Sequence, residues 1–307
     1  MASVAAKRKL KVACVQFTAT TDRDRNFRIC SKVIQDAANL GSEFVCLPEC
    51  FHFIGDANTK SIEVAEKMDE KTQMFPSIKK YCELASKLKV GLSLGGFPEV
   101  SSVDPGKVFN THLVITPEGK ISSLYRKMHL FDYPEGNLME SSFTTAGNEV
   151  VIDSKCLDGV NLGVSTCYDM RFPSLYQHLA AKGAEILLMP SAFTVATGMA
   201  HWEVLLRARA IETQSYVLAA AQVGKHNENP GRTSYGHAII IDPWGEIISQ
   251  CHGSTRENME HGTFAYAELD LDYLKSIRKK MPVRAHSRFQ VPVLLESKHI
   301  GTKDTSL

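Results

Sequence analysis

Short apolar runs of strand length alternate with amphipathic helical segments along this chain, and that alternation limits the folds open to it. LKVACVQF at residues 10–17 predicts a buried strand, and the segment 22–40 after it carries apolar residues at helical spacing. Gly41 ends this helix, and EFVCLPE at residues 43–49 predicts the next strand. The order strand, helix, strand predicts a βαβ unit with parallel strands.

A hairpin pattern follows and recurs later in the chain. A second helix is predicted over 71–88, before the strand VGLSLGGF. Strands at 110–116 and 120–126 then flank the turn Pro117-Glu118-Gly119. The same arrangement returns as HAIIID and EIISQ on either side of Pro243-Trp244-Gly245.

A second βαβ series lies between the two hairpins. GVNLGVST leads to a helix at 172–182, then EILLMP, a helix at 200–214 and SYVLAAAQV. Two comparable halves of this kind predict two sheets packed together under helices, an α/β four-layer α-β-β-α sandwich. We expect one domain over 9–288, a short extension at 1–8 and a tail at 289–307, with an arm from about Pro282 that packs on a partner subunit.

Composition narrows the class of partner. The 307 residues carry a formal charge of +1, so no broad basic field predicts binding to nucleic acid or to an anionic membrane. No apolar stretch is long enough to cross a bilayer, and none before the first strand is long enough for a secretion signal. The eight cysteines have no framework spacing, which favours reduced thiols. We expect a cytoplasmic protein. A form with a longer N-terminus that directs it to an organelle is the alternative.

Cys167 is the candidate nucleophile. It follows an apolar run and opens TCYDMRFP, which predicts a turn from a strand into a helix. A free thiol has a pKa of about 8.5, so reactivity near neutral pH requires a local base or a helix N-terminus. Glu49 and Lys127 each end a strand-like segment, LPE and YRK, and are the candidate partners.

These three segments, in this order, resemble the Glu-Lys-Cys triad of the nitrilase superfamily of carbon-nitrogen hydrolases. PSAFT, GMAHWEVLLRARAIETQSYVLAAAQVG and YGHAIIIDPWGEII extend the similarity over about 9–288, particularly to its amidase branch. The resemblance implies the same α-β-β-α sandwich, no cofactor and no metal. It also implies a homodimer, for which the helix at 200–214 and the C-terminal arm are the candidate contacts.

The resemblance also implies the roles of the residues. Glu49 is the general base and acid, Cys167 the nucleophile that forms a thioester, and Lys127 an oxyanion donor together with the backbone N–H of Tyr168. The family's second pocket glutamate corresponds to Glu140, with Glu135 as the competitor. The candidate substrate-binding residues are Tyr168, Arg171, Ser191, Phe193 and Thr194.

Arg171 lies four residues after Cys167 and can clamp a substrate carboxylate, or it can pair with a core or interface acid. The implied substrate is a small carboxylated amide. The amide bond of deaminated glutathione, cleaved to 2-oxoglutarate and cysteinylglycine, is the first candidate, and 2-oxoglutaramate is the second.

Other classes of function are less well supported. A catalytically silent interaction protein of this fold has no need of all three triad residues. A thiol redox or metal-binding protein would be built on Cys46, Cys50 and Cys167, but the chain has no C-x-x-C motif. Cys46, Cys50 and His52 have the spacing C-x3-C-x-H, but a zinc site there has no fourth ligand at a usual spacing. His201 and Trp202 open a helix whose apolar stripe predicts core or interface packing, and Gly95-Gly96 lacks the spacing of a phosphate-binding loop.

Overall fold

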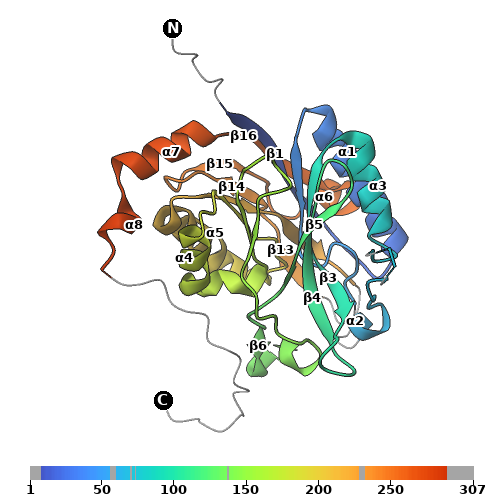
Figure 1. Cartoon of the computed structure of the whole chain (residues 1–307). Coiled ribbons are helices and arrows are strands. Elements are labelled where there is room, and N and C mark those ends of the chain that lie inside the picture. The colour runs from blue at the N-terminus through green and yellow to red at the C-terminus, as the bar shows by residue number, and fades with distance from the viewer. Residues whose placement is uncertain are drawn as a thin grey trace, which may run out of the picture.

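The computed structural model describes residues 8–55, 60–69, 71–72, 74–136, 138–227 and 232–288. Two β-sheets lie face to face, α1 (Arg23–Asn39) and α3 (Lys79–Leu88) cover one of them, and α4 (Pro173–Ala181) and α5 (Val195–Thr213) cover the other (Figure 1). This is the predicted α-β-β-α sandwich, and the prediction is confirmed.

The first sheet has the strand order β13-β12-β1-β2-β3-β4-β5, and β16 pairs with β1. Its strands are β1 (Lys9–Phe17), β2 (Phe44–Leu47), β3 (Gly91–Val100), β4 (Val108–Ile115), β5 (Ile121–Arg126), β12 (Ala221–Lys225), β13 (Thr233–Tyr235) and β16 (Thr263–Asp270). β1, β2 and β3 are parallel, and β4 and β5 form the predicted hairpin.

The second sheet has the order β15-β14-β11-β10-β9-β8. Its strands are β8 (Val151–Asp153), β9 (Leu162–Val164), β10 (Ile186–Leu188), β11 (Tyr216–Ala219), β14 (Ile239–Ile241) and β15 (Ile247–Gln250). β9, β10 and β11 are parallel, and β14 and β15 form the second predicted hairpin.

Alternating side chains of the strands separate two hydrophobic cores. In β1, Val12 and Cys14 contribute to the core shared with the second sheet, whereas Ala13 and Val15 join the core under α1 and α3. Only Ala220 separates β11 in the second sheet from β12 in the first. The chain therefore crosses between the sheets at this residue.

Two predicted helices have different bounds in the structure. Only the second half of 71–88 is helical, as α3, because Pro76 disfavours helical geometry at Phe75 and the chain before it forms turns. The helix expected at 200–214 begins five residues earlier, at Val195 of α5. The predicted helix at 172–182 corresponds to α4, with Pro173 in its first turn.

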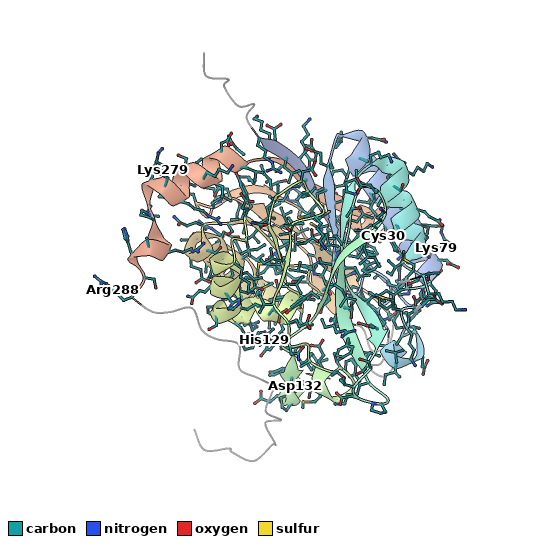
Figure 2. All side chains as sticks on the ribbon, viewed as in Figure 1. Cys30, Lys79, His129, Asp132, Lys279 and Arg288 are labelled. Atoms are coloured by element: carbon teal, nitrogen blue, oxygen red, sulfur yellow. The ribbon has the colours of Figure 1, made fainter. Side chains whose placement is uncertain are left out.

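The remaining elements lie around the two sheets. They are α2 (Lys60–Glu63), β6 (Asp132–Tyr133), η1 (Pro134–Gly136), β7 (Leu138–Met139), η2 (Glu140–Ser142), η3 (Cys167–Arg171), α6 (Arg256–His261), α7 (Leu271–Lys280) and α8 (Val283–His286). Figure 2 shows Lys279 of α7 and Arg288 at the periphery of the molecule. Arg284 of α8 donates to the Ala180 carbonyl of α4, so the described part of the expected arm contacts its own chain. The expected tail at 289–307 lies outside the described residues.

None of the helices in the described part of the chain is long and apolar enough to cross a membrane.

Candidate active site

The three triad candidates lie just past the carboxyl ends of strands from both sheets. Glu49 follows β2 after Pro48, Lys127 follows β5 directly, and Cys167 is the third residue after β9. β5 runs parallel to β2, since two antiparallel steps separate β5 from β3. Carboxyl ends of parallel strands meet at one edge of a sheet, which places Glu49 and Lys127 at the same edge of the first sheet.

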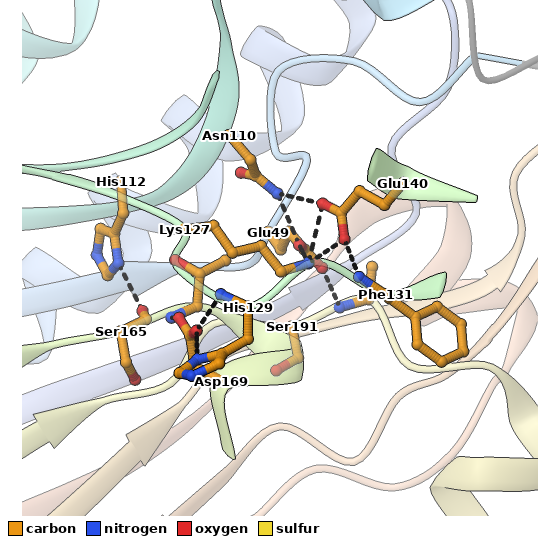
Figure 3. A network of polar contacts seen from close by, with 12 residues as sticks. Glu49, Asn110, His112, Lys127, His129, Phe131, Glu140, Ser165, Asp169 and Ser191 are labelled. Atoms are coloured by element: carbon orange, nitrogen blue, oxygen red, sulfur yellow. Dashed lines mark hydrogen bonds and ion pairs between the residues drawn. The ribbon is translucent and has the colours of Figure 1, made fainter. Parts of the chain in front are cut away.

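Lys127 lies between two glutamates (Figure 3). Its Nζ is 3.0 Å from Oε1 of Glu49 and 2.9 Å from Oε2 of Glu140. The side chains of Lys127 and Glu49 are only 3% and 5% exposed. Charges of these types are rarely buried unless they are paired, and here each has an opposite charge in direct contact.

Glu49 is held at both carboxylate oxygens. Its Oε1 also accepts a hydrogen bond from Nδ2 of Asn110 at 2.9 Å, and its Oε2 accepts one from the backbone N–H of Ala192 at 3.1 Å. The thiol of Cys167 is close enough to this carboxylate for each group to shift the pKa of the other. The glutamate therefore faces the nucleophile candidate in a fixed orientation.

The charges of the cluster set its resting protonation. Burial would raise the pKa of Glu49, but the Lys127 ammonium, the Cys167 thiol and the Arg232 guanidinium outweigh it and lower that pKa. Burial and the neighbouring Glu49 carboxylate raise the pKa of Cys167 well above its usual range, against the opposing effect of Lys127. Burial opposes the charge on Lys127, yet Glu140 and Glu49 raise its pKa. The resting site thus holds a thiol, an ammonium and two carboxylates.

The turn at Cys167 has an unusual backbone. Cys167 has φ 49°, in the left-handed region that a residue with a Cβ seldom adopts, and its N–H donates to the Pro190 carbonyl at 2.9 Å. The buried Asp169 carboxylate accepts from the Thr166 N–H at 2.9 Å, which closes the turn. A short 3₁₀ helix, η3, begins at Cys167 and leads into α4.

Asp169 also ties this turn to the segment that carries Lys127. It accepts from the hydroxyl of Tyr125 at 2.6 Å, and from the backbone N–H of His129 at 3.0 Å. Its Oδ1 lies 2.7 Å from Nδ1 of His129, whose ring stacks on Phe172. One carboxylate thereby fixes the nucleophile turn of the second sheet against the end of β5 in the first.

The structure separates the two candidates for the second glutamate. Glu140 contacts Lys127, and its Oε2 accepts the backbone N–H of Phe131 at 2.7 Å. Glu135 is exposed, and its partner is the hydroxyl of Tyr133. Only Glu140 therefore lies in the cluster.

A cavity of about 760 Å³ opens over the cluster. Glu49, Lys127, Glu140 and Cys167 line it. A volume of this size is typical of sites for small molecules.

Four of the five expected substrate-binding residues lie on the cavity wall, namely Tyr168, Arg171, Phe193 and Thr194. Ser191 does not: it is buried, and its hydroxyl donates to the Met189 carbonyl at 3.1 Å. Its strand-like backbone pairs with Ala221, which fixes the side chain away from the cavity. No described carboxylate is paired with Arg171, whose guanidinium lies near the rings of Tyr168 and Phe193 and 3.2 Å from Nδ1 of His201.

Three contributors were missing from the prediction. Asn110 and the backbone N–H of Ala192 hold Glu49, and Arg232 lines the cavity from the segment before β13. Asn110 lies inside an expected strand and Arg232 outside every motif, so only their places in the fold reveal them. The prediction named Ser191, Phe193 and Thr194 of the segment PSAFT, but it did not name the backbone amide of Ala192 between them.

The alternative metal site has no support in the described part of the chain. No group of three or more His, Cys, Asp or Glu residues there is arranged to hold a metal ion. Cys46 is buried in β2, and burial together with the nearby Arg23 and Lys80 lowers the pKa of His52 to about 3.

The layered fold, with a cysteine, a lysine and two glutamates gathered at the strand ends, has the form of a nitrilase-type hydrolase. A model of the carbon-nitrogen hydrolase family matches residues 11–279. The chain belongs to this family, and it is an enzyme that hydrolyses carbon-nitrogen bonds.

The relatives agree with this assignment. The chain is 43% identical over 289 residues to the deaminated glutathione amidase of Dictyostelium discoideum, covering 91% of this chain and 94% of the relative. It is 42% identical to the nitrilase and fragile histidine triad fusion protein NitFhit of Caenorhabditis elegans, over 96% of this chain, but spans only 63% of that protein.

Solved structures share the fold. The crystal structure of C. elegans NitFhit superposes with a TM-score of 0.82 at 40% identity, over 96% of this chain and 70% of that one. Saccharomyces cerevisiae Nit3, a member of branch 10 of the nitrilase superfamily, gives a TM-score of 0.78 at 31% identity, over 92% and 97% of the two chains.

Proposed function

We propose that this enzyme hydrolyses the amide bond of deaminated glutathione to 2-oxoglutarate and cysteinylglycine. The observation that carries the chemistry is the position of the Glu49 carboxylate, ion-paired with Lys127 and lining one cavity with Cys167. The substrate comes from the relatives, since the D. discoideum protein that matches over nearly its whole length is a deaminated glutathione amidase.

In the proposed acylation step, Glu49 takes the proton of Cys167 as the sulfur attacks the amide carbonyl. Lys127 and the backbone N–H of Tyr168 stabilise the oxyanion of the tetrahedral intermediate. Glu49 then gives its proton to the departing nitrogen, so that cysteinylglycine leaves and a thioester remains on Cys167.

In the proposed deacylation step, Glu49 takes a proton from water, and the resulting hydroxide attacks the thioester. The proton returns to the sulfur when 2-oxoglutarate leaves, so the enzyme ends as it began. Glu140 holds the Lys127 ammonium from the side opposite Glu49, and support for this role comes from its 2.9 Å ion pair.

The test of this function is 2-oxoglutarate release from deaminated glutathione and, separately, from 2-oxoglutaramate. We expect a higher kcat/KM for deaminated glutathione, and loss of activity in Cys167→Ala. The control is Cys50→Ala, which removes the other thiol on the cavity wall. A higher kcat/KM for 2-oxoglutaramate would assign the enzyme as an omega-amidase, and activity that survives in Cys167→Ala would refute the mechanism.

We also propose that the enzyme is a cytoplasmic homodimer that pairs through its outer helices. The support for pairing is an apolar patch on α5 and the adjoining turn, formed by Val204, Ile211 and Trp244, all of which are substantially exposed. Exposed apolar residues that lie together are typical of protein interfaces.

A further inference from the structure

Two arginines reach the cavity from different elements of the fold. Arg171 lies on η3, four residues from Cys167, and its guanidinium is 5.6 Å from the centre of the Phe193 ring. Arg232 precedes β13 of the other sheet, and its Nη2 lies 3.3 Å from the Ala192 carbonyl oxygen. The segment Ala192–Phe193 therefore has one guanidinium at each of its two residues.

Arg232 belongs electrostatically to the side of the cavity that holds the general base. Its positive charge contributes to lowering the pKa of Glu49 and acts on Cys50 as well. It is exposed, and among the described residues no carboxylate forms an ion pair with it. An arginine on a cavity wall with its fork of N–H donors unpaired by acid is suited to bind a carboxylate ligand.

The direction of the reaction assigns each arginine to one half of the substrate. The acyl half stays bonded to Cys167, next to Arg171, whereas the leaving half must present its nitrogen to Glu49, on the side of Arg232. Deaminated glutathione has one carboxylate on each half, on the 2-oxo acid and on the glycine, whereas 2-oxoglutaramate has a carboxylate on the acyl half alone.

We propose that Arg232 binds the carboxylate of the leaving group and so selects amides with an acid at both ends. This inference rests on the proposed function, because it assigns the two halves of that substrate. The charge count supports it: the cluster of two carboxylates, one ammonium and a thiol has a net charge of −1, and the two arginines change the cavity to +1. A dianionic substrate is therefore attracted to the cavity rather than repelled.

The test compares deaminated glutathione with its glycinamide analogue, in which a carboxamide replaces the glycine carboxylate. We expect Arg232→Gln to lower the ratio of kcat/KM for deaminated glutathione to kcat/KM for the glycinamide analogue by about 10-fold, mainly through KM. This is the loss expected for a charged hydrogen bond that is partly screened by water. Arg232→Lys should retain part of the preference. Raising the ionic strength should reduce the preference of the wild type.

Arg28→Gln is the matched control, since Arg28 is an exposed arginine of α1 away from the cavity. In Arg28→Gln the ratio of the kcat/KM values for deaminated glutathione and its glycinamide analogue should equal that of the wild type. If the wild type has equal kcat/KM values for both substrates, the inference is wrong and the proposed function stands. If Arg232→Gln loses the same activity on both substrates, the inference is also wrong, because Arg232 then acts through Glu49. A wild type that hydrolyses neither substrate would overturn the proposed function, and the inference with it.

Discussion

Glu49, Lys127 and Cys167 form a buried group in which one proton can move without a change of net charge. Transfer of the Cys167 proton to Glu49 places the negative charge on sulfur while Lys127 remains beside both groups. Loss of the same proton to solvent would leave this buried group with a net negative charge, which is costly. The raised pKa of Cys167 is therefore compatible with a nucleophile, because the thiol transfers its proton to Glu49 during the attack and not before it.

The pH dependence of alkylation at Cys167 tests this interpretation. In the wild type, Glu49 has a lowered pKa and stays ionised at neutral pH, so carbamidomethylation by iodoacetamide should be nearly independent of pH between about 6 and 8 and should fall only in acid. In Glu49→Gln, hydroxide must remove the proton, so the rate should be about 100-fold lower at pH 7 and should rise steadily with pH. Peptide mass spectrometry resolves Cys167 from Cys50.

Glu135→Gln is the control for this measurement, because Glu135 is an exposed glutamate whose partner is Tyr133 and which does not touch the cluster. Parallel pH profiles for the wild type and Glu49→Gln would show that Glu49 is not the base.

At the scale of elements, the site depends on a close approach of the two sheets at β3. A Cβ at Gly95 would lie 2.3 Å from Cβ of Pro190 and 2.4 Å from the Leu47 carbonyl oxygen. Leu47 precedes Glu49 by two residues, and Pro190 precedes Ala192 by two. The absence of a side chain at Gly95 therefore allows the base and the amide that orients it to come together.

Gly95→Ala should separate these segments. We expect a loss of about 1–3 kcal/mol in the free energy of unfolding, as for overpacking in a core, and a fall in kcat/KM larger than the loss of folded protein explains. Thermal unfolding and kinetics on the same preparation give both values. Gly106→Ala is the control, because no atom lies within 4 Å of its added Cβ; its strained positive φ should reduce stability while kcat/KM stays unchanged. Unchanged kcat/KM in Gly95→Ala would refute this role.

The same elements explain what the sequence predicted and what it did not. The ends of β2, β5 and β9 were predictable, since strand-like segments end there before Glu49, Lys127 and Cys167. Residues 128–147 lack periodicity, so their sequence did not distinguish Glu140 from Glu135. Asn110 reaches Glu49 across 61 residues of chain, and Arg232 reaches Ala192 across 40. Such contacts follow from the packing of the whole fold and leave no local pattern in the sequence.

At the scale of the whole molecule, the two sheets bury one face against each other and the other under helices, which leaves the outer surface of α5 to be explained. Val204 and Ile211 lie seven residues apart, on the same side of this helix. The turn before β15 lies beside them, because Arg207 of α5 donates to the Gly245 carbonyl at 2.8 Å. The patch of Val204, Ile211 and Trp244 is thus built from two elements that are fixed to each other, as a permanent interface requires.

Val204→Glu tests whether this patch joins two copies of the chain. In a two-fold dimer the same patch meets itself, so the substitution brings two like charges into one apolar contact at a cost of several kcal/mol. We expect a dimer for the wild type and a dissociation constant at least about 100-fold higher for the variant, measured by sedimentation equilibrium. Val103→Glu is the matched control, because Val103 is 67% exposed against 68% for Val204 but lies between β3 and β4. A monomeric wild type would refute the dimer, and a Val204→Glu dimer as tight as the control would place the interface on another face.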